Sequence, residues 1–175
     1  MRQIRYGVAM SLDGYIAGPN GEYDWIVHDP DIDFDLGAMF SRFDTLLMGR
    51  KTFAGMMSGG GAGPMEGLRI IVVSRTLRQS DYPNVTVISE NVPETVSKLR
   101  EQPGKDIWLF GGGMLFQTML EAKLVDGLDM GVIPVLVGGG VPFLPAPARQ
   151  TRLKLTNHKV YKSGIVMLEY GVEYT

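Results

Sequence analysis

The chain has 175 residues, the size of one domain, and its 45% hydrophobic and 21% charged residues are usual for a globular protein. Lys and Arg number 17 and Asp and Glu number 19, so the formal net charge of −2 gives no basic surface for nucleic acid or an anionic membrane. The absence of cysteine excludes disulfides, iron–sulfur clusters and thiol nucleophiles. The only histidines, His28 and His158, lie too far apart in sequence to suggest a metal centre.

Short apolar runs, several of them rich in β-branched residues, predict strands along the whole chain. They are expected at residues 4–12, 15–17, 45–48, 68–74, 85–88, 106–110, 128–132, 153–160 and 165–170. The last two flank Lys162-Ser163-Gly164, a sequence typical of a hairpin turn.

Helices are expected between these strands, at residues 31–43, 50–57, 91–101 and 114–122. The first has apolar residues at helical spacing up to Phe43, behind acidic residues in its opening turn. The third starts with Asn91 as a capping residue, followed by an early proline and Glu94. Alternating strands and helices predict an α/β fold with a mostly parallel sheet, and the closing hairpin adds an antiparallel edge. We expect residues 1–175 to form a single domain.

The segment from Met130 to Ala148 carries no charge and has the length of a membrane span. Its four glycines and four prolines would break a helix repeatedly, so a short buried strand and a loop fit it better. The N-terminus also lacks the cleavage pattern of a signal peptide. We therefore expect a cytoplasmic protein.

The most informative local sequence is Gly111-Gly112-Gly113, which joins a buried strand to a helix. Glycines let a ligand approach the backbone closely, and the free N–H groups of a helix start attract phosphate. The spacing differs from the G-x-G-x-x-G fingerprint, because Leu115 and Phe116 follow where that pattern needs glycine. A tight turn that binds nothing is the alternative.

Two further turns follow predicted strands and carry cations and hydroxyls. They are Gly49-Arg50-Lys51-Thr52 and Ser74-Arg75-Thr76. Either alone is also typical of a solvated turn. The carboxyl ends of parallel strands share one edge of an open α/β sheet, however, and ligands usually bind there. Together the three turns predict a site for an extended cofactor that carries phosphate.

The order of these motifs resembles the dihydrofolate reductase superfamily over nearly the whole chain. The resemblance is carried by residues 9–17, Trp25, residues 47–53, Val73-Ser74-Arg75 and Phe110 to Gly113. Residues 11–18 and 132–140 are more similar to the branch of the bacterial riboflavin-biosynthesis reductase domain. The resemblance implies a three-layer sandwich around an eight-stranded sheet and a reductase that uses NADPH.

The resemblance also implies roles for individual residues in binding NADPH. Ala9 and Ile16 would contact the nicotinamide, and residues 49–52 would form the first phosphate-binding turn. Ser74, Arg75 and Thr76 would surround the 2′-phosphate that distinguishes NADPH from NADH. Gly111, Gly112 and Gly113, with Met114 and Leu115, would hold the pyrophosphate.

The substrate half follows the family pattern less closely. Dihydrofolate reductases carry an acidic residue five positions after a tryptophan like Trp25, and here that position is Pro30. Acids stand instead at Asp31, Asp33 and Asp35, and all three could merely complement the helix dipole. We choose Asp35 as the catalytic and substrate-binding carboxylate, with Trp25 and Phe34 lining the substrate pocket. His28 is expected at the surface.

The sequence thus predicts an NADPH-dependent reductase acting on a small heterocycle, without metal, nucleic acid or membrane partners. The resemblance suggests reduction of 5-amino-6-(5-phosphoribosylamino)uracil, and the zinc motif of the partner deaminase is absent with the cysteines. Reduction of dihydrofolate or a pteridine is one alternative, and a non-catalytic NADPH-binding module is another. The oligomeric state is left open, with a homodimer among the options.

The run from Ser58 to Pro64 is rich in glycine and follows the helix of the Gly49 turn. We expect it to be mobile without ligand, either as a lid over the site or as a surface bulge.

Overall fold

The structure is a computed structural model that describes residues 1–27, 29–58 and 67–174, and only the backbone of residues 33–35. His28 and most of the glycine-rich run, with the lid predicted there, lie outside the described residues.

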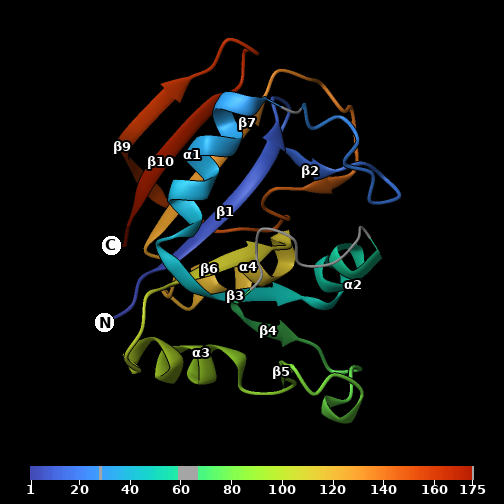
Figure 1. Ribbon diagram of the computed structural model, residues 1–175, viewed down its shortest axis with the longest axis vertical. Coiled ribbons are helices and arrows are strands. Elements are labelled where there is room, and N and C mark those ends of the chain that lie inside the picture. The colour runs from blue at the N-terminus through green and yellow to red at the C-terminus, as the bar shows by residue number, and fades with distance from the viewer. Residues whose placement is uncertain (28, 59–66, 175) are drawn as a thin grey trace.

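An eight-stranded sheet runs through the molecule (Figure 1). Six strands are parallel: β1 (Ile4–Ser11), β3 (Phe43–Gly49), β4 (Arg69–Val73), β5 (Val85–Ile88), β6 (Asp106–Gly111) and β7 (Gly127–Ile133). The closing hairpin of β9 (Arg152–Val160) and β10 (Val166–Glu173) adds two antiparallel strands. The order β5-β4-β3-β6-β1-β7-β10-β9 confirms the mostly parallel sheet with an antiparallel C-terminal edge.

Helices cover both faces of the sheet and make three layers. On one face, α1 (Pro30–Phe40) and α2 (Arg50–Ser58) pack on the cluster of Trp108 and Phe53. On the other face, α3 (Val92–Glu101) and α4 (Gly113–Glu121) pack on a larger cluster that includes Tyr6. A short 3-10 helix, η2 (Gln79–Asp81), precedes β5.

The strands divide their side chains between these layers by the alternation of a pleated sheet. Leu47 and Leu109 belong to the α3–α4 core, whereas Leu46 and Trp108, one position away in the same strands, belong to the α1–α2 core. Because both faces are apolar, the central strands read as nearly continuous hydrophobic runs, and this made them recognisable in the sequence.

A second, two-stranded sheet pairs β2 (Tyr15–Ala17) with β8 (Val141–Pro142). It joins the segment after β1 to the loop after β7, and the Phe143 N–H donates to the Gly14 carbonyl at 2.9 Å. The sequence analysis predicted β2 but not β8. A two-residue strand has no periodicity of its own, and its partner lies more than a hundred residues away in the chain.

One sequence prediction about a helix end is wrong, and another holds for the position of the cap but not for its hydrogen bond. Phe43, expected as the last apolar residue of the first helix, begins β3 and is buried beside Trp108, with the ring centroids 5.7 Å apart. Met39 and Phe40 of α1 pack against the same cluster, so one apolar pattern runs from helix to strand. Asn91 precedes α3 but caps it with no side-chain hydrogen bond, because its backbone is left-handed (φ 48°).

Within the described part of the chain, no helix is long and apolar enough to cross a membrane.

Candidate cofactor and substrate site

The three turns singled out in the sequence meet at the carboxyl edge of the parallel strands. Gly49 ends β3 beside Val73, the last residue of β4, and Met48 pairs with Gly111 at the end of β6. Helices α2 and α4 begin directly after two of these strand ends. The first N–H groups of both helices therefore lie at one edge of the sheet, where intrahelical partners are missing.

The Gly49 turn and the triple-glycine turn lie against each other, with Thr52 between them. A Cβ atom placed on Gly49 would lie 3.9 Å from the Gly111 carbonyl oxygen. A Cβ atom on Gly111 or Gly112 would lie 3.5 or 3.6 Å from the Thr52 hydroxyl oxygen. This side of the site is therefore a surface of glycine backbone with one hydroxyl group.

Two of the three glycines are required for identifiable reasons. Gly111 has φ +138°, a conformation that residues with a side chain rarely adopt, and its peptide bond to Gly112 is cis. A Cβ atom on Gly113 would lie 2.7 Å from the Pro142 carbonyl oxygen and 3.1 Å from that of Phe143. The start of α4 is thus fitted closely against the end of β8 and the residue that follows it.

Met114 and Leu115, also expected to contact the pyrophosphate, differ in their surroundings. The Met114 side chain is exposed, whereas that of Leu115 is buried in the α3–α4 core. The Leu115 N–H donates to the Gly112 carbonyl at 3.0 Å. Leu115 therefore anchors the helix start, and its backbone N–H is already used within the turn.

The third turn is closed by Ser74. Its buried hydroxyl accepts hydrogen bonds from the N–H groups of Thr76 (3.2 Å) and Leu77 (3.0 Å). The Arg75 and Thr76 side chains are exposed at the resulting corner. Arg78, which the sequence analysis did not single out, is exposed next to them. The sequence signal for Arg78 is its place three residues after Arg75.

The sequence analysis also did not predict a group of hydrogen bonds beside the end of β1. This group, here called the clasp, joins Ser11, Asp13 and Tyr15 to Val137 and Gly138. The fully buried Ser11 hydroxyl donates to Asp13 at 2.7 Å and accepts from the Tyr15 N–H at 2.9 Å. The Asp13 carboxylate accepts from the N–H groups of Val137 (3.1 Å) and Gly138 (2.7 Å). These bonds, the Ser11 hydroxyl first, lower the pKa of Asp13 to about 2. The clasp fixes the β7–β8 loop beside Ile16.

Ala9 and Ile16 are both half-buried near this clasp. Ala9 lies in β1 and packs against the cluster beneath α1, and Ile16 is the middle residue of β2. Ala9 lies near the carboxyl end of β1, which stands between β6 and β7 in the sheet.

On the α1 side, Trp25 packs against the cluster of Ile32 and Tyr161, and its Nε1 donates to the Glu22 carbonyl at 3.2 Å. Asp29 caps α1 by accepting from the Asp31 N–H at 2.9 Å. The Ser163 hydroxyl, ahead of the backbone donors, lowers the pKa of Asp29. The Asp29 carboxylate therefore has a structural role, as the N-terminal cap of α1.

Asp35 and Phe34 lie in the helical backbone of α1, and their side chains are outside what the structure describes. Asp31 is exposed.

An aromatic cluster that the sequence did not reveal lies on the face of the sheet that α1 and α2 cover. Trp108 stacks on Phe40, with centroids 4.6 Å apart, and meets Phe110 edge-on at 5.0 Å. Phe110 is half-buried near the carboxyl end of β6 and lies on this same face.

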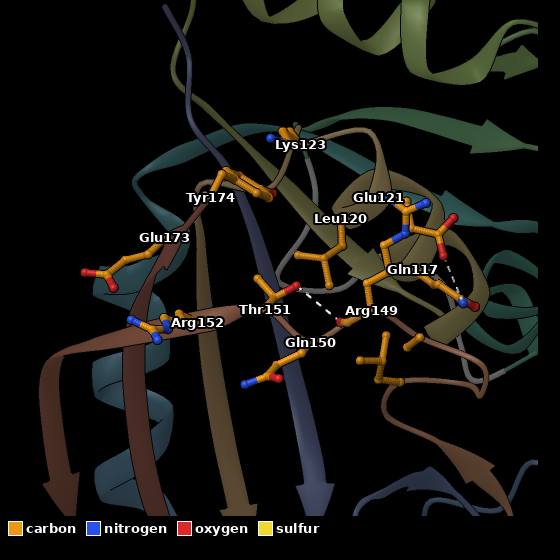
Figure 2. A pocket seen from close by; sticks show the side chains of 12 residues that line it. Gln117, Leu120, Glu121, Lys123, Arg149, Gln150, Thr151, Arg152, Glu173 and Tyr174 are labelled. Carbon is orange, nitrogen blue, oxygen red and sulfur yellow. Dashed lines mark hydrogen bonds between the residues drawn. The ribbon is translucent and has the colours of Figure 1, made fainter.

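The described surface has two hollows. One of about 420 Å³ lies between the end of α4 and the outer ends of the β9–β10 hairpin (Figure 2). The other, of about 320 Å³, separates α1 from the hairpin. Neither is lined by any of the three turns. Among the described residues no three His, Asp or Glu side chains gather as metal ligands.

The site's residues fit the phosphate groups of a dinucleotide. Two helix starts, a glycine surface and the exposed cations Arg50, Lys51 and Arg75 all lie at one edge. A mostly parallel sheet of this order, with helices on both faces, has the dihydrofolate-reductase-like fold.

Comparison with known proteins gives the family. The model of the RibD C-terminal domain matches residues 2–167, and the chain belongs to this family. It is 35% identical to the uncharacterized protein YyaP of Bacillus subtilis (strain 168) over 180 residues, covering 97% of this chain and 94% of YyaP.

Solved structures agree with this assignment. A putative riboflavin biosynthesis protein from Shewanella sp. PV-4 superimposes with a TM-score of 0.84 at 25% identity, covering 98% of this chain and 99% of that one. Dihydrofolate reductase from Enterococcus faecalis, complexed with NADP(H), gives a TM-score of 0.70 at 21% identity, with 98% and 97% coverage. The second likeness concerns the fold alone.

Proposed function

We propose that this chain is an NADPH-dependent reductase that transfers hydride to a C=N or C=O bond of a small heterocycle or its open-chain precursor. The observation that carries the proposal is the meeting of three phosphate-suited turns at the carboxyl edge of β3, β4 and β6. Membership of a family of reductases supports the same chemistry. We propose that residues 1–175 act as one domain, in the cytoplasm.

The three turns divide the binding of the cofactor between them. The Gly49 turn, with Arg50, Lys51 and Thr52, and the triple-glycine turn would hold the pyrophosphate. The exposed Arg75 and Thr76 would hold the 2′-phosphate, with Ser74 keeping their turn closed. NADPH would supply the hydride when bound.

The residues near β1 and α1 would hold the substrate and keep water away. Ala9 and Ile16 would contact the nicotinamide, and Trp25 and Phe34 would line the substrate pocket. We keep Asp35 as the carboxylate that binds the heterocycle and assists protonation beside the hydride acceptor. Phe110 joins this set because it lies on the α1–α2 face at the end of β6.

The substrate class suggested by the family is 5-amino-6-(5-phosphoribosylamino)uracil, and a pteridine or dihydrofolate is the alternative. The test is a screen of NADPH oxidation with each compound, on the intact chain and on Asp35→Asn. Asp31→Asn, which changes an exposed acid of the same helix, is the matched control. We expect turnover with one compound, reduced by the Asp35 change only. No turnover of any compound would overturn the reductase proposal.

A non-catalytic NADPH-binding module is the second candidate, and one observation favours it. The position five after Trp25 is Pro30, which begins α1, and the preceding acid, Asp29, is used as the helix cap. Tight NADPH binding without hydride loss to any heterocycle would support this function in place of the first. We also propose that two copies of the chain associate.

A further inference from the structure

The loop between β2 and α1 contains an asparagine that is followed by glycine, Asn20-Gly21. The other asparagines of the chain precede larger residues: valine after Asn84 and Asn91, and histidine after Asn157. Glycine has no Cβ atom, so it leaves the asparagine side chain open to attack by the next backbone nitrogen. Asn20 and Gly21 are both exposed. This sequence and this exposure favour deamidation of Asn20.

The reaction needs no reagent except water. The Gly21 nitrogen bonds to the side-chain carbonyl carbon of Asn20, and the Cγ–Nδ2 bond breaks. The proton of the attacking N–H passes to the leaving nitrogen, which departs as ammonia. Water then opens the cyclic imide at either carbonyl and gives aspartate, or isoaspartate with the backbone running through the side-chain carbon. Both products carry a carboxylate where Asn20 has an amide.

In the folded chain, hydrogen bonds hold both reacting groups. The Asn20 side-chain amide donates to Glu22 Oε1 at 2.6 Å, and the Asn20 backbone N–H donates to Glu22 Oε2 at 2.8 Å. The Gly21 N–H, which is the attacking group, donates to the Gly18 carbonyl at 3.0 Å. Ring closure has to break these bonds, so the Glu22 carboxylate slows it.

Glu22 also connects this turn to Trp25. The Glu22 carbonyl oxygen accepts from the Gly18 N–H at 2.8 Å and from Trp25 Nε1 at 3.2 Å. The Glu22 side chain and backbone thus join Asn20, the start of the turn and the indole ring in one set of hydrogen bonds. A change at Asn20 that displaces Glu22 therefore reaches Trp25.

We propose that Asn20 is a site of spontaneous deamidation, that Glu22 restrains the reaction, and that the product loosens the turn that holds Trp25. A carboxylate at position 20 cannot donate to Glu22, and it puts two like charges where a hydrogen bond of 2.6 Å lies. The Asn20 side chain is also the first of the groups that lower the pKa of Glu22. The chemistry at Asn20 is independent of the proposed function, and only its effect on the substrate pocket rests on it.

The test follows the conversion of Asn20 in the intact folded chain with time, by mass spectrometry and an assay for isoaspartate. Glu22→Ala removes both carboxylate acceptors and should speed the conversion roughly three- to tenfold, a modest factor because Glu22 is exposed. Asp24→Ala, which changes another exposed acid of this loop, is the matched control and should leave the rate unchanged. No product at position 20 in Glu22→Ala would overturn the proposal, and so would equal rates in Glu22→Ala and the unmodified chain.

Asn20→Asp reproduces one product and tests the link to Trp25. Quenching of tryptophan fluorescence by acrylamide should increase in this variant, because Trp25 loses a fixed acceptor whereas Trp108 stays buried. Asn20→Gln keeps the amide on a longer side chain that disfavours ring closure, so it should show neither conversion nor increased quenching. Unchanged quenching in Asn20→Asp would show that the product does not loosen the turn. Neither measurement uses NADPH or a heterocycle, so this proposal and the proposed function can fail independently.

Discussion

The Arg75 side chain lies exposed at a corner that Ser74 keeps closed, at the carboxyl end of β4. A planar guanidinium there suits a phosphate, and NADPH differs from NADH by one such group. A charge-assisted hydrogen bond contributes about 1.5–3 kcal/mol. Arg75→Ala should therefore weaken NADPH binding roughly ten- to a hundredfold and leave NADH nearly unchanged, as measured by calorimetric titration.

Arg69→Ala is the control for this change, because Arg69 is exposed at the other end of the same strand. Arg69→Ala should alter neither the affinity for NADPH nor the affinity for NADH. Raised salt should narrow the preference for NADPH in the unmodified chain. If Arg75→Ala weakens both cofactors equally, Arg75 does not read the 2′-phosphate and the choice of NADPH loses its main support.

The lowered pKa of Asp13 predicts how the stability of the chain depends on pH. Its pKa is about 2 in the folded chain and 3.8 for the free group, because the Ser11 hydroxyl and two backbone N–H groups stabilise the charged carboxylate. A lowered pKa means stability that is fully present above about pH 4 and is lost as the pH falls towards 2. In Asp13→Asn, the free energy of unfolding in urea should vary less with pH in this window.

Other carboxylates titrate in the same window, so the comparison between chains isolates Asp13. Asp81→Asn, which changes an exposed acid in η2, should keep the pH dependence of the unmodified chain. Identical slopes for Asp13→Asn and the unmodified chain between pH 4 and 2 would show that the clasp contributes nothing to stability.

At the scale of the element, the start of α4 is in close contact with the end of β8 and with Phe143. A methyl group on Gly113 would meet two backbone carbonyls, which cannot move aside as a side chain can. Gly113→Ala should lower the free energy of unfolding by about 1–3 kcal/mol and weaken NADPH binding. Chemical denaturation and a binding titration measure both effects.

Gly55→Ala is the matched control in α2, because a Cβ atom there meets nothing within 4 Å. It should stabilise the chain by roughly 0.5–1 kcal/mol through helix propensity. Equal effects of the two substitutions would mean that the close fit at Gly113 does not exist in solution.

The elements also show what the sequence can and cannot predict. Central strands were found because both faces of the sheet are covered and their apolar runs are local signals. The β2–β8 pair and the Asp13 clasp were missed because each joins residues more than a hundred positions apart. The place of Ser74 after a strand predicts contact with phosphate, which stays a prediction, but it did not reveal that the hydroxyl closes the turn. Local sequence gives the residue and its neighbours, not the bond it makes.

The whole molecule distributes its charge unevenly along the carboxyl edge, although its net charge is only −2. The exposed cations Arg50, Lys51, Arg75 and Arg78 belong to the turns after β3 and β4, whereas the exposed acids Asp24 and Asp31 stand before and in α1. The edge therefore has a cationic half at the turns after β3 and β4 and an acidic half beside α1. For the proposed NADPH, this division favours the orientation that puts its phosphates over β3, β4 and β6.

The most direct test of this account is the thermal unfolding of the intact chain with increasing NADPH, and with NADH in parallel. At a hundred times its dissociation constant, a ligand stabilises the folded state by about 2.7 kcal/mol. For a chain of this size that corresponds to a rise in midpoint of roughly 5–10 °C. We predict this rise with NADPH and a smaller one with NADH at equal concentration. A midpoint that NADPH leaves unchanged at every concentration would contradict the account.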